Sequence, residues 1–269
     1  MATENPTAVG HGPVPAASHR RDRPAGDGPV FLRARRPMRD DSRLAGHPVV
    51  AFIVVALVGF ALLAAVTVLI GWLLKTYVLP EHGIGHADEH VNVWFAQHRD
   101  GTRNDVSFWL SGIGDVLAIP ALVAITAVVA MVMRRWRVAA FIVAAIAVEA
   151  ATYRVATWVI HRQRPNVPRL DDLPAAASYY SGHTAASIAV YCGIALLITS
   201  RIRSGWIRVV VWTIAIAIPA LVALSRMYRG MHHPTDVAAA VMVGIGSLLV
   251  AVAAARAADA AVRWRKADA

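Results

Sequence analysis

Six apolar runs, most of them long enough to cross a lipid bilayer, dominate the 269-residue chain. A spanning helix needs about 20 predominantly apolar residues, and backbone inside lipid must satisfy its own hydrogen bonds, which a helix does. The predicted spans cover residues 49–74, 106–133, 138–160, 183–198, 206–224 and 237–255. We therefore predict an all-α fold, a polytopic membrane helical bundle with six transmembrane helices.

Polar residues weaken the first half of the second predicted span, namely Ser111, Gly112, Gly114 and Asp115. In the polar segment 79–105 that precedes it, Val91, Trp94 and Phe95 follow one another at helical spacing. This pattern predicts a short interfacial helix.

The charge pattern indicates how the chain is oriented. Only 16% of residues are charged, against about 25% in soluble proteins. The net charge of +10 comes mainly from short arginine clusters beside the apolar runs, a pattern typical of topology signals, so we expect no nucleic-acid partner. The clusters lie in alternate segments: the N-terminal segment, 134–137, 201–208 and the C-terminal tail. The positive-inside rule predicts cytoplasmic termini in the cell membrane and extracytoplasmic segments 79–105, 161–182 and 225–236.

The chain divides into three parts by composition. Residues 1–47 contain eight arginines and few large apolar residues, which predicts a disordered cytoplasmic segment. Residues 48–256 form the predicted membrane domain, and 257–269 a short basic cytoplasmic tail. Cys192 is the single cysteine, so it has no intrachain disulfide partner. No sequence feature predicts an oligomeric state.

The loop between the last two spans carries an unusual set of polar residues, Arg226, Arg229, His232, His233 and Asp236. Pro234 is suited to the first position of a helix, and Asp236 follows His232 by four residues, so both side chains can share a face. A carboxylate beside an imidazole makes a usable nucleophile or base. The alternative is a polar loop with incidental charges.

The second extracytoplasmic loop supplies matching groups. Ser181 is a predicted N-cap of the fourth span, and Gly182 allows close backbone approach. A helix N-terminus suits phosphate, and Arg164 and Arg226 can add bidentate contacts. His183 follows directly, where it can donate a proton to a leaving oxygen.

Three ordered motifs stand in these two loops: Arg164-Pro165, Ser181-Gly182-His183, and Ser225-Arg226-x5-His232-x3-Asp236. Together they resemble the signature motifs of the type 2 phosphatidic acid phosphatase (lipid phosphate phosphatase) superfamily, with which vanadium haloperoxidases share a fold core. The resemblance covers roughly residues 106–255.

The resemblance implies a role for each residue. His232 would attack phosphorus and form a phosphohistidine, Asp236 would orient His232, and His183 would protonate the leaving group. The phosphate oxygens would be held by Arg164, Arg226 and the backbone near Ser181 and Gly182.

The resemblance also implies that no metal or other cofactor is needed. The alternative is a zinc site drawn from His161, His183, His232, His233 and Asp236, and no known ligand spacing fits it.

The sequence departs from the family pattern twice. Thr157 stands where the family has a phosphate-binding lysine, and Tyr180 stands where it has proline. Arg154 lies one helical turn before Thr157, so we expect it either to supply the missing charge or to neutralise Glu149. Tyr180 is expected to alter the loop backbone or to line the entrance of the site.

The predicted function is hydrolysis of a lipid phosphate or diphosphate at the outer face of the membrane. Polyprenyl diphosphate, phosphatidic acid and phosphatidylglycerol phosphate types all remain open, and the outward-facing site favours polyprenyl diphosphate. The alternatives are a non-catalytic lipid-phosphate binding or transport protein of the same fold, and a haloperoxidase.

Overall fold

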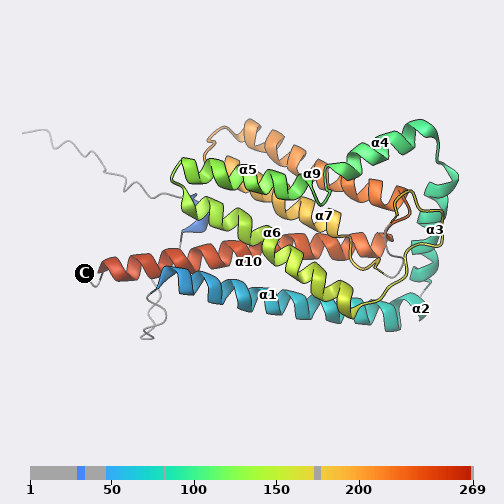
Figure 1. The fold of residues 1–269 in the computed structure, drawn as a ribbon, viewed down its shortest axis with the longest axis horizontal. Helices are drawn as coiled ribbons and strands as arrows, with labels where there is room; N and C mark the ends of the chain where they lie inside the picture. Colours follow the sequence, from blue (N-terminus) through green and yellow to red (C-terminus); the bar gives the residue numbers. More distant parts are fainter. Residues whose placement is uncertain (1–28, 34–46, 82, 173–176, 268–269) are drawn as a thin grey trace, which may run out of the picture.

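The computed structural model describes residues 29–33, 47–81, 83–172 and 177–267, and every regular element in these ranges is helical (Figure 1). The all-α prediction is confirmed. The α-helices are α1 (Pro48–Leu73), α2 (Leu79–Glu81), α3 (Ile84–Gln97), α4 (Gly101–Gly112), α5 (Ala118–Val132), α6 (Trp136–Val159), α7 (Gly182–Ser187), α8 (Gly193–Thr199), α9 (Gly205–Tyr228) and α10 (Pro234–Ala267). A 3-10 turn, η1 (Val30–Leu32), and two π-helical stretches, η3 (Leu74–Val78) and η4 (Ile188–Cys192), complete the described elements.

Five helical stretches of the described chain are long and apolar enough to cross a membrane. They are Pro48–Val78, Trp136–Val159, Gly182–Thr199, Gly205–Tyr228 and Pro234–Arg265. The sixth apolar helix, α5, has 15 residues. At about 1.5 Å per residue it spans roughly 22 Å, less than the ~30 Å of a typical hydrocarbon core.

The predicted second span, residues 106–133, is wrong in its first half. The chain forms two helices there, because α4 ends at Gly112 and α5 begins at Ala118. The apolar side chains of Val106 and Trp109 in α4 are 52% and 73% exposed, while Ser107 and Ser111 are buried. These exposed apolar side chains raise the hydropathy of a helix that has only 12 residues.

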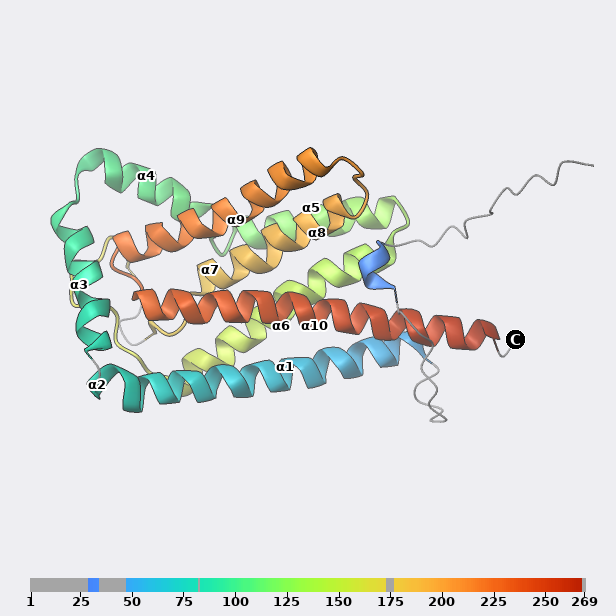
Figure 2. The ribbon, with the colours of Figure 1, turned by 180° about the vertical axis from the view of Figure 1, so that it is seen from behind.

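Helix α10 is the centre of the bundle, with α1, α6 and α7 packed against it (Figures 1 and 2). The contact with α7 depends on Gly244. A Cβ atom at this position would lie 2.7 Å from the Cβ of Ile188 and 2.8 Å from the carbonyl oxygen of Ala185. Only glycine therefore allows α10 to approach the helix that carries His183 so closely.

The two loops that carry the motifs lie at the same end of the bundle, opposite the C-terminus (Figure 1). Helix α3 crosses this end roughly perpendicular to the long helices (Figures 1 and 2). The predicted helix around Trp94 is thus confirmed, and its indole is 50% exposed. The same arrangement brings segments 79–105, 161–182 and 225–236 together.

Most of the predicted disordered segment 1–47 lies outside the described residues, but the prediction does not hold for residues 30–32. These residues form η1, in which Leu32 is buried and the ring of Phe31 packs edge-on against Phe141. The Nε atom of Arg256 donates to the carbonyl oxygen of Phe31 at 2.6 Å. Two adjacent apolar side chains are enough to dock this short piece on the bundle.

Substituting Gly244 with alanine should destabilise the protein. Alanine improves helix propensity by up to ~1 kcal/mol, but overpacking against atoms that cannot rotate away costs roughly 1–3 kcal/mol. We expect a lower midpoint of thermal unfolding in detergent. Gly112→Ala is the matched control, because no atom lies within 4 Å of the added Cβ. Equal midpoints for the two variants would show that the α7–α10 contact is not tight.

Candidate active site

A cavity of about 840 Å³ opens between the α4–α5 connection, α6, α7 and the C-terminal end of α9. Five of the predicted site residues line it: Arg164, Gly182, His183, Arg226 and His232. They come from three segments that are distant in the sequence. The bundle therefore brings residues of all three motifs to one cavity.

His232 is held in one orientation at the wall of this cavity. Its imidazole is 3% exposed, and Nδ1 lies 2.7 Å from the carbonyl oxygen of Ser178. Because a carbonyl only accepts, Nδ1 carries a proton, and in the neutral ring Nε2 holds the lone pair. Burial keeps the pKa of His232 well below its ordinary range, and the positive charges of Arg226 and Arg164 lower it further against the opposing effect of Asp236. The ring is thus in the form that a nucleophile requires.

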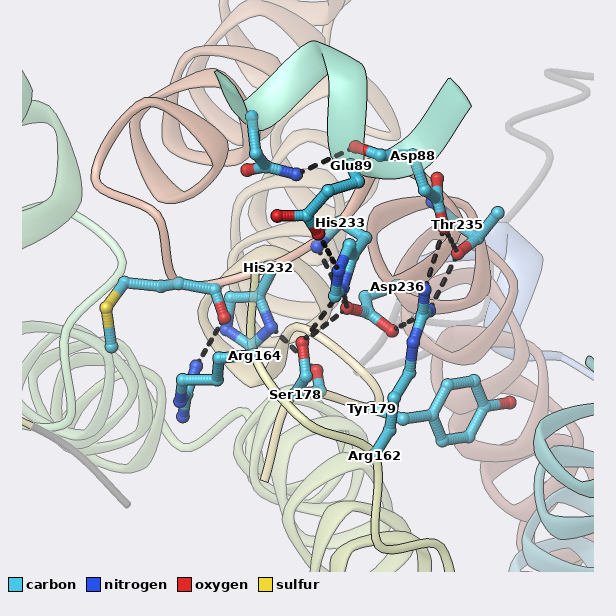
Figure 3. A network of polar contacts seen from close by, with 12 residues as sticks. Asp88, Glu89, Arg162, Arg164, Ser178, Tyr179, His232, His233, Thr235 and Asp236 are labelled. Atoms are coloured by element: carbon cyan, nitrogen blue, oxygen red, sulfur yellow. Dashed lines mark hydrogen bonds and ion pairs between the residues drawn. The ribbon is translucent and has the colours of Figure 1, made fainter. Parts of the chain in front are cut away.

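Asp236, which was expected to orient His232, makes no hydrogen bond to it within the described residues. Its buried carboxylate accepts from the hydroxyl of Ser178 at 2.6 Å, from the backbone N–H of His233 at 2.9 Å and from Arg162 at 2.6 Å (Figure 3). The reason is helix geometry: Asp236 lies in the first turn of α10 and folds back to cap the preceding N–H. Ser178 bonds to both residues, and the carboxylate of Asp236 also acts on the imidazole of His232 through its charge.

Arg162 joins this arrangement to helix α3. Its guanidinium is 8% exposed and donates to Asp236 and, at 2.8 Å, to Asp88 of α3 (Figure 3). The neighbouring Glu89 lies 3.3 Å from Nε2 of His233. An arginine between two buried carboxylates neutralises charges that would each be costly alone. The interfacial helix is therefore part of the support of the site.

Arg226 has unused hydrogen-bond donors. One amino nitrogen donates to Ser111 at 2.8 Å and to Asp171 at 2.6 Å. Its Nε and its other amino nitrogen are buried and have no partner among the described residues. Unpaired buried donors are costly, and the oxygens of a phosphate are well suited to satisfy a guanidinium. Arg164, 8% exposed, donates to the carbonyl oxygen of Met231 at 2.5 Å.

A third arginine and an unpredicted carboxylate also line the cavity. Arg229 donates to Asp171 at 2.5 Å and to the hydroxyl of Ser107 at 3.1 Å. Burial alone would raise the pKa of Asp171, but the hydrogen bond from Arg229 and the charges of Arg226 and Arg229 hold it below its ordinary range. Asp171 therefore stays ionised and holds both arginines in place.

His183 stands in the first turn of the helical stretch that begins at Gly182. Its Nε2 atom lies 3.7 Å from a carboxylate oxygen of Asp115, in the α4–α5 connection. Ser181 is the N-cap as predicted, but its hydroxyl pairs with that of Thr184 at 2.9 Å and does not bond to the helix backbone. The first N–H groups of this helix are not capped by that side chain, and free N–H groups at a helix start favour an anion.

The structure does not bring Arg154 or Thr157 to the cavity. The side chains of α6 that line it are Ile146, Glu149, Ala150 and Tyr153, which follow one helical stripe. Arg154 is off this stripe and exposed, and the hydroxyl of Thr157 donates to the backbone oxygen of Tyr153 at 2.8 Å. The charge missing at Thr157 is therefore not replaced by Arg154.

Tyr180 is buried below the cavity, and its hydroxyl lies 3.3 Å from both the backbone oxygen and the carboxylate of Glu149. Glu149 thus has Tyr180 as its partner, and Arg154 does not neutralise it. The adjacent Tyr179 donates to the backbone oxygen of Thr67 in α1 at 2.8 Å. These two rings anchor the loop that carries Ser178 and Ser181.

Comparison with known proteins agrees with this fold. The PAP2 superfamily model matches residues 138–259. Among solved structures, a transmembrane PAP2 type phosphatidylglycerolphosphate phosphatase from Bacillus subtilis is similar, with a TM-score of 0.59 and 24% identity, over 76% of this chain and 93% of that chain. No curated protein matches.

The fold and the cavity define a multi-pass membrane protein with a polar site at one end of a helical bundle. The match of residues 138–259 to the PAP2 superfamily model agrees with the resemblance drawn from the motifs.

Replacing Arg162 with methionine should strongly destabilise the protein. The variant would leave Asp88 and Asp236 buried without their shared cation, and breaking such a pair costs about 3–5 kcal/mol. Thermal unfolding in detergent measures the loss. Arg154→Met is the matched control, because an exposed side chain of the same kind should change stability by no more than ~0.5 kcal/mol.

The control also tests the expectation that Arg154 supplies a phosphate-binding charge. Phosphate release by Arg154→Met should equal that of the wild type, because Arg154 is exposed and does not line the cavity. If Arg162→Met unfolded at the wild-type temperature, the ion-pair network would not be holding the site together.

Proposed function

We propose that this protein is a membrane lipid phosphatase that works through a phosphohistidine at His232. The observation that carries the proposal is the tautomer of His232, whose Nδ1–H is bonded to Ser178 while the ring lines a cavity that also holds the unpaired donors of Arg226. A nucleophile and an anion site in one cavity fit transfer of a phosphoryl group.

In the first proposed step, Nε2 of His232 attacks phosphorus and the bond to the leaving oxygen breaks. Protonated His183 gives its proton to that oxygen, and Arg226 and Arg164 stabilise the charge on the phosphoryl oxygens. Water then attacks phosphorus, His183 accepts a proton from it, and the P–N bond breaks to give phosphate and free His232. Hydrolysis needs only water as co-reactant.

The surroundings of the cavity favour a lipid substrate. Val116 lines the cavity and is 74% exposed, and the adjacent Leu117 is 79% exposed. Ile119 and Pro120 continue the apolar wall. In a bilayer such side chains face acyl chains, so a lipid tail can remain in the membrane while its phosphate reaches Arg226. The Bacillus subtilis neighbour acts on a lipid phosphate, which supports the same general class here.

Replacing His232 with asparagine should abolish phosphate release from a lipid phosphate in detergent, by at least about a thousandfold, because the nucleophile is lost. His161→Asn is the matched control: this loop histidine is exposed and should leave the rate unchanged. A chelator should not lower wild-type activity, because within the described residues no group of three or more histidine, cysteine or acidic side chains is arranged to hold a metal. Wild-type activity no higher than that of His232→Asn would refute the enzyme proposal.

Thr157 stands where the family has a lysine, and this difference leaves one alternative open. The protein would then bind or transport lipid phosphates without hydrolysing them. This alternative predicts saturable binding of the lipid phosphate to wild type and to His232→Asn alike, without phosphate release from either. The oriented tautomer of His232 favours the enzyme, because binding alone does not require it.

We propose further that the site faces outward and that both termini are cytoplasmic, as the arginine pattern predicts. Cysteine introduced for Gln163 should react with an impermeant thiol reagent added to intact cells, whereas cysteine introduced for Arg203 should not. Both positions are exposed, and Cys192 is partly buried in a span, so the unmodified chain gives the background. The opposite labelling pattern would reverse the orientation.

A further inference from the structure

We propose that Asp115 is a specificity-determining residue that selects lipid phosphomonoesters with an uncharged leaving alcohol over lipid diphosphates. The inference rests on the proposed function and narrows its substrate class. It also opposes the expectation of a polyprenyl diphosphate substrate.

The hydrogen-bond donors that have no partner among the described residues indicate where the transferred phosphoryl group binds. Arg226 is 2% exposed, lines the cavity, and has two buried nitrogens that bond to no described residue. Its remaining amino nitrogen is already bonded to Ser111 and Asp171. One phosphoryl group between Arg226 and His232 would use the free donors.

The leaving group must lie on the side of His183, the proposed acid. Asp115 occupies that side, 3.7 Å from Nε2 of His183; it lines the cavity, and its side chain is 47% exposed. A leaving alcohol meets a hydrogen-bond acceptor there, whereas a leaving phosphate meets a like charge.

The arginines of the cavity do not offset this. Arg226 and Arg229 share the carboxylate of Asp171, and Arg164 is bonded to a backbone oxygen. The lining residues comprise three arginines against three aspartates, so the wall has no excess of positive charge for a second phosphate. A like charge placed in a binding site lowers the affinity for the wrong ligand more than it raises the affinity for the right one.

The test compares two substrates with the same tail, farnesyl monophosphate and farnesyl diphosphate, by phosphate release in detergent. Wild-type kcat/KM should be higher for the monophosphate. Asp115→Asn should shift the ratio toward the diphosphate by roughly five- to tenfold, as expected for removal of one partly exposed charge. Asp115→Glu keeps the charge and should keep the wild-type preference. Asp105→Asn in α4, an exposed carboxylate outside the cavity lining, should leave both rates unchanged.

A second measurement on wild type does not depend on the folding of a variant: pyrophosphate should inhibit monophosphate hydrolysis more weakly than inorganic phosphate does. A wild-type preference for the diphosphate, or a ratio that Asp115→Asn leaves unchanged, would overturn the proposal for Asp115 while the phosphatase proposal stands. If wild type released phosphate from neither substrate, nor from any other lipid phosphate, the proposed function itself would fail.

Discussion

The buried guanidinium of Arg162, which bridges Asp88 and Asp236, is the interaction on which the rest of the site depends. It connects three parts of the chain: the interfacial helix α3, the loop after α6 and the start of α10. Each carboxylate would be expensive to bury alone, and together they hold the arginine in one place. With Asp236 fixed in this way, the hydroxyl of Ser178 has a partner, and its carbonyl can fix His232. The orientation of His232 is thus set through Ser178, which bonds both to the imidazole and to the buried carboxylate of Asp236.

The motif residues that line the cavity could be predicted from the sequence because each belongs to a short motif. Arg164, His183, Arg226 and His232 all line one cavity, as expected. Their supporting partners could not be predicted. Ser178 acts partly through its backbone carbonyl, which any residue could provide, so its identity gives no signal. The hydrogen-bond partners of Asp236 are set by where the first turn of α10 places the Asp236 side chain. The four-residue spacing from His232 does not determine this.

The fold shows a similar division. Long apolar runs predicted five of the spanning helices correctly, because burial in lipid leaves no alternative to a helix. The prediction of one span over residues 106–133 was wrong because hydropathy reports which residues are present and not which way their side chains point. In α4 the apolar side chains of Val106 and Trp109 are exposed, whereas Ser107 and Ser111 are buried and bond to Arg229 and Arg226. The polar residues that weakened the predicted span are therefore the ones that build the wall of the cavity.

This inversion also explains where the acidic residues of the site come from. A helix that ended deep in the membrane could not place a half-exposed carboxylate beside His183, because an ionised group in hydrocarbon is costly. The break between α4 and α5 places Asp115 on the lining of the cavity, 3.7 Å from His183, and Val116, on the same lining, directly after it. One irregular connection thus supplies both a carboxylate near His183 and an apolar side chain at the wall of the cavity.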